Sequence, residues 1–195
     1  MVNDRCRNCL GDIRFTPPLQ GARAQAVKFA HHNKGAKLHF KLDEVQPLWL
    51  CTVSTKNKSP YLMGIADHNG TKTSGADGTY VVAATKNDSI SDTKDARSIV
   101  SGFEKCFKLD GKVGAYLSHD WATDPFSKGL WSCYRSQGMS EHLVALQQPH
   151  ELVFFASADW ANGWRGFIDG ALESGKNAAK SVASLLEKTT LETRI

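Results

Sequence analysis

Hydrophobic and polar residues alternate with a period of two between Ala36 and Leu42. Every second side chain there is hydrophobic, and those in between are lysine or histidine. This pattern is typical of a strand with one buried face. Apolar and β-branched runs bounded by turn residues predict further strands. These are expected at Ile13–Thr16, Leu48–Val53, Tyr61–Ala66, Thr79–Ala84, Val113–Trp121 and Glu151–Ala156.

Hydrophobic residues spaced three and four apart predict helices between several of these strands. The clearest stripe runs from Ala96 to Phe107, and Ser91 or Asp92 can cap the helix that carries it. Because strands and helices are interspersed, the sequence predicts an α/β fold of the mixed α+β kind. The other helices are expected at Pro18–Ala30, Glu141–Leu146 and Gly166–Glu187.

Composition and charge narrow the class of protein. The chain has 195 residues, of which 41% are hydrophobic and 23% charged, which is enough for a buried core and excludes a wholly disordered chain. The net charge of +4 comes from mixed signs, so binding to nucleic acid is not expected. No apolar stretch reaches the roughly 18 residues of a membrane span, so none is predicted. Without a signal peptide or a C-terminal Ser-Lys-Leu, we expect an intracellular and cytoplasmic protein.

Cysteine usage leaves a metal or redox site weakly supported. Cys6 and Cys9 form a C-x-x-C pair, which could be half of a zinc site or a redox pair. A structural zinc site needs four ligands, and no second C-x-x-C or matching histidine pair follows. We therefore expect free thiols and no metal.

The turn between the last predicted strand and the last helix carries the clearest candidate chemistry. A helix N-terminus offers unpaired N–H groups and the positive end of the helix dipole. Asp159 follows the strand, and small residues at Gly163, Gly166 and Gly170 would let a ligand approach the backbone. Two interpretations remain open. The turn binds a large planar cofactor with a sugar-like tail, or it is an ordinary corner whose aromatic side chains fill the core.

Three ordered motifs resemble the FAD-dependent amine oxidases. Residues 155–171 read F-A-x2-D-x4-W-x-G-F-I-x-G-A, which resembles the C-terminal flavin-binding motif of that family. Residues 121–129 read W-x2-D-P-x-S-x-G, which resembles a loop that returns to the cofactor. Residues 13–19 read I-x-F-x-P-P-L, and G-x-K-L-x-F follows at 35–40; these resemble the substrate-binding domain. The chain is thus similar to the C-terminal portion of the family.

The resemblance implies roles for particular residues. It places Trp131 and Phe167 on either side of the substrate amine. No catalytic side chain is assigned. Leu130 stands where some members carry a cysteine bound to flavin, so non-covalent FAD is implied. The implied FAD contacts are Asp159, Trp164, Gly166, Phe167 and Ile168.

The resemblance also implies an activity. The reaction would be FAD-dependent oxidation of a primary or secondary amine to an imine, with oxygen as the second substrate. Hydrolysis would then release an aldehyde or keto product and ammonia or an amine, together with hydrogen peroxide.

Domain organisation follows from the same resemblance. Residues 1–120 are expected to form part of a mixed-sheet substrate-binding domain. Residues 121–187 would be the C-terminal flavin-binding segment of a partial FAD/NAD(P)-binding-type domain, and 188–195 a tail.

One motif of such enzymes is missing. The G-x-G-x-x-G turn that grips the pyrophosphate occurs nowhere in the chain. Two hypotheses remain. The chain works with a complementary N-terminal oxidase fragment or as a homo-oligomer, or it is a catalytically inactive, truncated paralogue that serves as a binding module.

Overall fold

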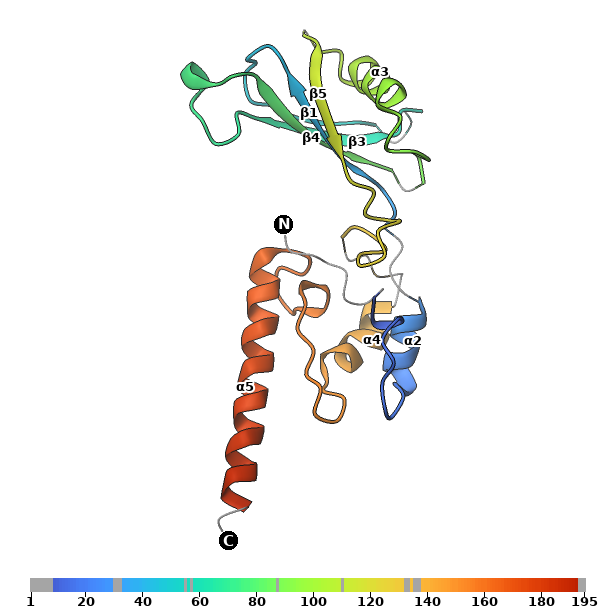
Figure 1. Cartoon of the computed structure of the whole chain (residues 1–195), viewed down its shortest axis with the longest axis vertical. Coiled ribbons are helices and arrows are strands. Elements are labelled where there is room, and N and C mark those ends of the chain that lie inside the picture. Colours follow the sequence, from blue (N-terminus) through green and yellow to red (C-terminus); the bar gives the residue numbers. More distant parts are fainter. Residues whose placement is uncertain are drawn as a thin grey trace. The chain divides into compact units, whose positions relative to one another are not determined.

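A computed structural model describes residues 9–29, 33–54, 56, 58–86, 88–109, 111–131, 134 and 138–192. The chain divides into two compact units, one formed by residues 1–33 and 123–195 and the other by residues 34–122 (Figure 1). The predicted α/β fold class is confirmed. Assigning residues 1–120 to substrate binding, 121–187 to flavin binding and 188–195 to a tail remains a prediction.

The unit of residues 34–122 contains a five-stranded sheet in the order β2-β3-β4-β1-β5. In one detail it differs from the expected mixed sheet, because every pairing of these described strands is antiparallel. The strands are β1 (Lys37–Leu42), β2 (Leu50–Thr52), β3 (Tyr61–Asp67), β4 (Thr79–Thr85) and β5 (Val113–Ser118).

Helix α3 (Ala96–Phe107) covers one face of this sheet and closes its core (Figure 1). The rings of Phe40 and Phe103 stack with centroids 3.8 Å apart. The buried Tyr61 donates its hydroxyl hydrogen to the Ile99 carbonyl at 2.7 Å. The predicted faces of β1 and α3 are therefore the ones that meet.

The start of α3 differs from the prediction. Its cap is Asp95, whose carboxylate accepts a hydrogen bond from the Ser98 N–H at 3.1 Å, and neither Ser91 nor Asp92 takes that place. Any of these three side chains can cap a helix. The spacing of hydrophobic residues alone did not distinguish them, because it fixes the buried face of a helix and leaves its first residue open.

The opposite face of the sheet carries a cross-strand row that includes a histidine on β1. His39 pairs with Val82 on one side and Leu117 on the other, and Val82 pairs in turn with Ile65. Burial among these neighbours, and secondarily the charge of Lys37, lowers the pKa of His39 below its ordinary value. The folded protein therefore favours the neutral imidazole.

We expect this histidine to make stability depend on pH. Because the folded pKa lies below the ordinary value of about 6.5, the unfolded chain takes up the proton first as the pH falls. Stability should be unaffected above that value and decline below it. The measurement is the urea midpoint at pH values from about 7.5 to about 5.5. His39→Gln should flatten the decline and Lys37→Met should reduce it; identical profiles for His39→Gln and the parent chain would refute the assignment.

The other unit is built mainly from helices. Its core brings Leu10, Ala26, Leu146 and Trp160 together. No helix in the described ranges is both long and apolar enough to cross a membrane. The elements are α2 (Gly21–Phe29), α4 (Gly138–Gln147), the 3₁₀ turn η2 (Ala158–Trp160) and α5 (Ile168–Glu192).

Two predicted strands are absent from this unit. Ile13–Thr16 and Glu151–Ala156 form no ladder, and the second range takes part only in an isolated bridge between His150 and Val153. A strand needs a neighbour to receive its backbone hydrogen bonds, and no described strand lies beside either range. The sequence pattern predicts an extended backbone, but it does not show whether a second strand lies beside it.

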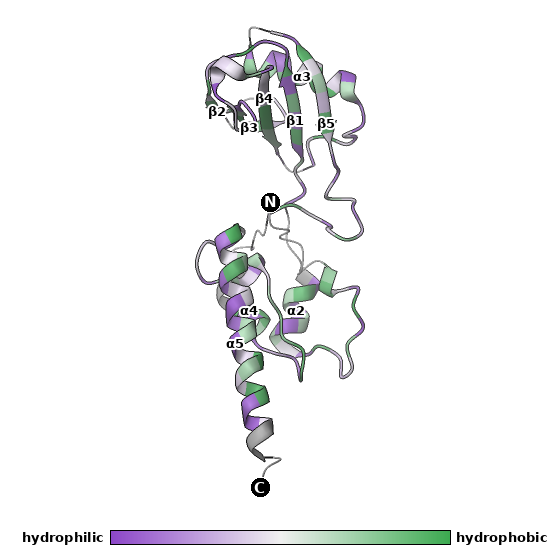
Figure 2. Cartoon of the chain, turned by 60° about the vertical axis from the view of Figure 1, so that its left-hand side comes forward, coloured by the Kyte–Doolittle hydropathy of each residue, from purple (hydrophilic) through white to green (hydrophobic). Residues whose placement is uncertain are grey.

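Helix α5 also differs at both ends from the prediction. It starts at Ile168 and not at Gly166, and it continues to Glu192, beyond the predicted end at Glu187. Hydrophobic and hydrophilic positions alternate along it (Figure 2). Leu172 and Leu186 on this helix are exposed. Only part of the surface of this long helix is therefore covered by the rest of the described unit.

Candidate functional site

The turn that leads into α5 is held by backbone hydrogen bonds. The Gly166 N–H donates to the Ala158 carbonyl at 3.1 Å, and the Phe167 N–H donates to the Trp164 carbonyl at 3.0 Å. Trp164 has a φ of 44° and Gly166 a φ of 82°, both in the left-handed region. A tryptophan seldom adopts that conformation, so the surrounding bonds must stabilise it.

Gly170 lets the turn lie directly against the first turn of α5. A Cβ at this position would lie 2.4 Å from the Trp164 carbonyl oxygen and 3.1 Å from the Ala161 Cβ. No side chain fits there without moving the backbone of the turn. Gly170 therefore supports the conformation of Trp164.

The beginning of α5 presents N–H groups that have no acceptor within the helix. The first helical bond runs from the Ala171 N–H to the Phe167 carbonyl at 3.1 Å. The N–H groups of residues 168–170 thus point out of the helix end, where the dipole favours negative charge. Of the implied FAD contacts, Phe167 has its N–H engaged within the turn, whereas the N–H of Ile168 belongs to the open helix end.

Exposed hydrophobic side chains surround this helix end. Trp164 is 70% exposed, Phe167 and Ile168 are each 56% exposed, and the Trp164 and Phe167 rings meet edge to face with centroids 5.9 Å apart. Core aromatics would be covered, so the interpretation of these rings as core filling does not hold for either. They remain available to a ligand or to another surface.

Asp159 lies inside the unit. Its side chain has no exposed surface, its N–H donates to the Ser157 hydroxyl oxygen at 3.1 Å, and its carbonyl accepts the Tyr134 hydroxyl at 2.8 Å. The structure thus buries Asp159 within this unit, whereas the rings of Trp164 and Phe167 are exposed. A ligand would touch its carboxylate only after the residues covering it had moved.

The loop before Trp131 is a hydrogen-bonded turn around Asp124. The Asp124 carboxylate accepts the Phe126 N–H at 2.9 Å and the Ser127 hydroxyl at 2.8 Å. Ser127, two residues after Pro125, is fully buried, which favours a small polar residue at this position. Trp131 comes after this turn and is 42% exposed. Trp131 and Phe167 are both described, and their rings are not in contact.

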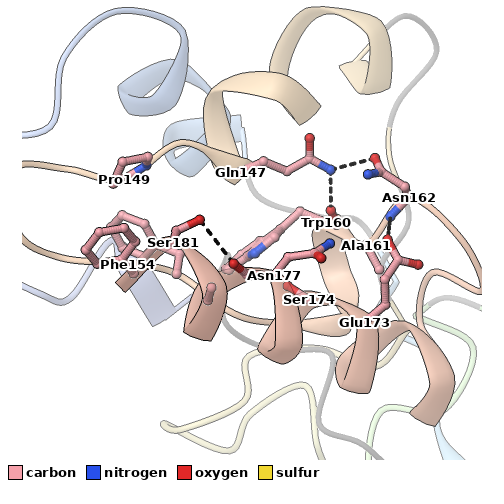
Figure 3. Close-up of a pocket in the computed structure, with 12 residues that line it drawn as sticks. Gln147, Pro149, Phe154, Trp160, Ala161, Asn162, Glu173, Ser174, Asn177 and Ser181 are labelled. Carbon is pink, nitrogen blue, oxygen red and sulfur yellow. Dashed lines mark hydrogen bonds between the residues drawn. The ribbon is translucent and has the colours of Figure 1, made fainter. Parts of the chain in front are cut away.

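A pocket of about 160 Å³ lies between α5 and the segment that precedes the turn (Figure 3). Trp160 lines it with a buried indole N–H that finds no hydrogen-bond partner among the described residues. Across the pocket, the Gln147 amide donates to the Trp160 carbonyl at 2.7 Å and to the Asn162 side chain at 2.8 Å. The sequence analysis did not predict this pocket. A stripe of polar residues on α5 that line it could have indicated it: Glu173, Ser174, Asn177 and Ser181.

Metal ligation finds no support in the part of the chain that the structure describes. No group of three or more histidine, cysteine, aspartate or glutamate side chains there could hold an ion. Cys9 is half-buried, and Cys6 lies outside the described residues.

Sequence comparison relates nearly the whole chain to known enzymes. The family model described as flavin containing amine oxidoreductase matches residues 8–183. Pseudooxynicotine dehydrogenase of Pseudomonas sp is 32% identical over 182 residues, covering 92% of this chain and 35% of that protein. Nicotine dehydrogenase of Pseudomonas putida (strain DSM 28022 / S16) is also 32% identical, covering 92% of this chain and 36% of that protein. The chain thus spans about a third of the length of these relatives.

Solved structures share the fold at low sequence identity. Cyclohexylamine oxidase from Brevibacterium oxydans IH-35A superposes with a TM-score of 0.71 at 19% identity, covering 94% of this chain and 42% of that one. Putrescine oxidase bound to putrescine gives a TM-score of 0.73 at 16% identity, covering 91% and 41%. With a family model matching residues 8–183, the chain belongs to the family of flavin-containing amine oxidoreductases.

Proposed function

We propose that this chain is the C-terminal part of an FAD-dependent enzyme that oxidises a primary or secondary amine to an imine. Hydrolysis of the imine then gives an aldehyde or keto product and ammonia or an amine. The observation that carries the proposal is the open N-terminus of α5 with exposed aromatic rings beside it. In a chain of this family, such a helix end suits the polar edge of a flavin ring.

The residues at this helix end fit the ring part of the cofactor. Ile168 and the two residues after it present N–H groups to an electronegative edge, and Trp164 and Phe167 offer apolar surface to a flat ring. Gly166 allows the turn that brings them together. Bound FAD would supply the two-electron oxidation chemistry. Leu130 carries no nucleophile, so we propose that the cofactor is held without a covalent bond.

Each remaining site residue has a more limited proposed role. Phe167 and Trp131 would orient the amine by packing against it, because exposed aromatic rings can hold a neutral amine and exclude water. Asp159 would accept hydrogen bonds from cofactor hydroxyl groups. Since it is fully buried, that role requires the turn to open when the cofactor binds.

The rest of the cofactor site would come from a portion that the relatives contain and this chain lacks. No two of the 16 glycines are separated by a single residue, so the chain has no G-x-G pair of a pyrophosphate turn. We propose that a complementary N-terminal portion supplies it. Oxygen is the proposed electron acceptor. Because the two relatives that match 92% of this chain are named dehydrogenases, the acceptor needs its own test.

The test compares the chain alone with a fusion. The fusion joins the part of pseudooxynicotine dehydrogenase outside the matched segment to the N-terminus of this chain. The chain alone should purify without stoichiometric flavin absorbance, and the fusion should be yellow. Adding the right amine should remove the yellow absorbance under nitrogen, and admitting oxygen should restore it with hydrogen peroxide. A folded, FAD-loaded fusion that responds to no primary or secondary amine would favour the inactive paralogue.

Phe167→Ala in the fusion tests the aromatic role. We expect kcat/KM for the amine to fall by roughly tenfold or more, because the ring contacts the substrate in this proposal. The matched control is Phe126→Ala, which removes a ring that is 82% exposed and has no proposed role. Equal losses in both variants would refute the assignment of Phe167.

A further inference from the structure

An Asn-Gly pair follows strand β3 in the unit of residues 34–122. Asn69 and Gly70 are the central residues of a tight turn, and their φ values of 52° and 76° are those of a type I′ turn. A hydrogen bond of 3.0 Å from the Thr71 N–H to the His68 carbonyl closes the turn. Asn69 is exposed, and a Cβ placed at Gly70 would meet nothing within 4 Å. The pair therefore has room to change its conformation.

An Asn-Gly pair carries both a nucleophile and an electrophile. The backbone nitrogen of the glycine can attack the side-chain amide carbon of the asparagine, because glycine has no Cβ to obstruct the approach. The attacking nitrogen loses its proton, the bond to the side-chain amide nitrogen breaks, and ammonia leaves as a succinimide ring closes. Water then opens the ring at either carbonyl and gives aspartate or isoaspartate. Water is consumed and ammonia is released, so the reaction needs no enzyme, oxidant or cofactor.

The reacting groups of the Asn69-Gly70 pair are not engaged. Within the part of the chain that the structure describes, the Gly70 N–H donates no hydrogen bond and the Asn69 side-chain amide makes none. The backbone N–H of Asn69 donates to an Asp67 carboxylate oxygen at 2.6 Å. That bond and the bond that closes the turn restrain the backbone, but they leave the attacking nitrogen and the amide carbon accessible to each other.

The chain's other Asn-Gly pair, Asn162 and Gly163, is held differently. The Gly163 N–H donates to a Glu173 carboxylate oxygen at 3.0 Å, and the Gln147 side-chain amide donates to the Asn162 side-chain oxygen at 2.8 Å (Figure 3). The carboxylate also disfavours loss of the Gly163 proton, because it would repel the resulting anion. Asn162 is exposed like Asn69, so exposure does not distinguish the two pairs.

We propose that Asn69 is a site of spontaneous deamidation, which converts it to aspartate or isoaspartate, and that Asn162 is protected by its hydrogen bonds. The product places a negative charge beside the Asp67 carboxylate, which accepts the Asn69 N–H. Like charges repel, and isoaspartate adds a methylene group to the backbone, so the turn after β3 loosens. The modification requires no flavin and is independent of the proposed function.

Incubation of the folded chain at mildly alkaline pH tests the proposal. Peptide mass spectrometry follows the conversion of each asparagine, and a protein isoaspartyl methyltransferase with a labelled methyl donor detects isoaspartate. Each hydrogen bond that must open lowers the reactive population by roughly fivefold, so Asn69 should react roughly tenfold faster than Asn162. In urea, where both pairs are unfolded, the two rates should become similar.

Two variants sharpen the test. Glu173→Ala removes the acceptor of the Gly163 N–H and should accelerate deamidation at Asn162 by roughly fivefold, while the rate at Asn69 stays unchanged. Asn69→Gln moves the amide carbon one bond farther from the backbone, so ring closure becomes slow and the acidic product should not accumulate.

Three results would overturn the proposal. Equal rates at the two asparagines of the folded parent chain would show that the hydrogen bonds do not control the reaction. A ratio of rates that is the same in urea would show that the fold plays no part, and this comparison holds even if Glu173→Ala fails to fold. An acidic product that still accumulates in Asn69→Gln would place the modification at another residue.

Discussion

Replacing Gly170 by alanine should destabilise the helical unit by about 2 kcal/mol. The added Cβ would lie 2.4 Å from the Trp164 carbonyl oxygen, and backbone atoms cannot move aside as the end of a side chain can. Overpacking of this kind costs about 1–3 kcal/mol, and a contact with backbone belongs at the upper end. The better helix propensity of alanine returns up to about 1 kcal/mol. The measurement is the free energy of unfolding in urea.

Gly175→Ala is the matched control for that substitution. Gly175 lies on the same helix, and a Cβ there would meet nothing within 4 Å. Alanine at this position should stabilise the chain by about 0.5–1 kcal/mol through helix propensity alone. The same change should therefore have opposite signs at two positions five residues apart. In the fusion, Gly170→Ala should also weaken FAD retention, whereas Gly175→Ala should not. Two stabilising substitutions would show that the turn does not depend on close packing at Gly170.

The sheet of residues 34–122 was largely predictable because its signals are local. The alternation at Leu38, Phe40 and Leu42 fixes which face of β1 is buried, since a shift of one residue would invert every side chain. The stripe on α3 carries the matching side chains. Strand order and the antiparallel direction depend on contacts between distant segments, and no local pattern encodes them.

The candidate site was predictable only in part. The motif around Gly166 marks the turn, and the structure brings Trp164, Phe167 and Ile168 together at the start of α5. The burial of Asp159 was not predictable, because Tyr134 lies 25 residues earlier in the chain. The prediction of a strand at Glu151–Ala156 failed for a related reason, because a strand also depends on a partner from a distant segment. Its residues favour a sheet that the described part of this chain does not provide.

Arg23 should be the polar side chain on which the helical unit depends most. It is 8% exposed, and its guanidinium donates to the Ala145 carbonyl at 2.9 and 2.7 Å and to the Pro149 carbonyl at 3.3 Å. It also donates to the Gln148 carbonyl. These acceptors lie at the C-terminal end of α4, where a cation is favoured by the helix dipole. Burial lowers the pKa of the guanidinium, which nevertheless stays charged because arginine begins so high.

Arg23→Met keeps the aliphatic stem and leaves three partly buried carbonyl groups without their donor. We expect a loss of about 2–4 kcal/mol in the free energy of unfolding, since unsatisfied buried polar groups cost about 1–3 kcal/mol each and do not add fully. Arg23→Lys should lose less, because one ammonium group can satisfy some of the carbonyls but not all of them. Lys28→Ala removes an exposed cation from the same helix and should change stability by less than about 0.5 kcal/mol. If Arg23→Met proved as stable as the Lys28→Ala control, water would replace the guanidinium, and the carbonyls at the end of α4 would be open to solvent.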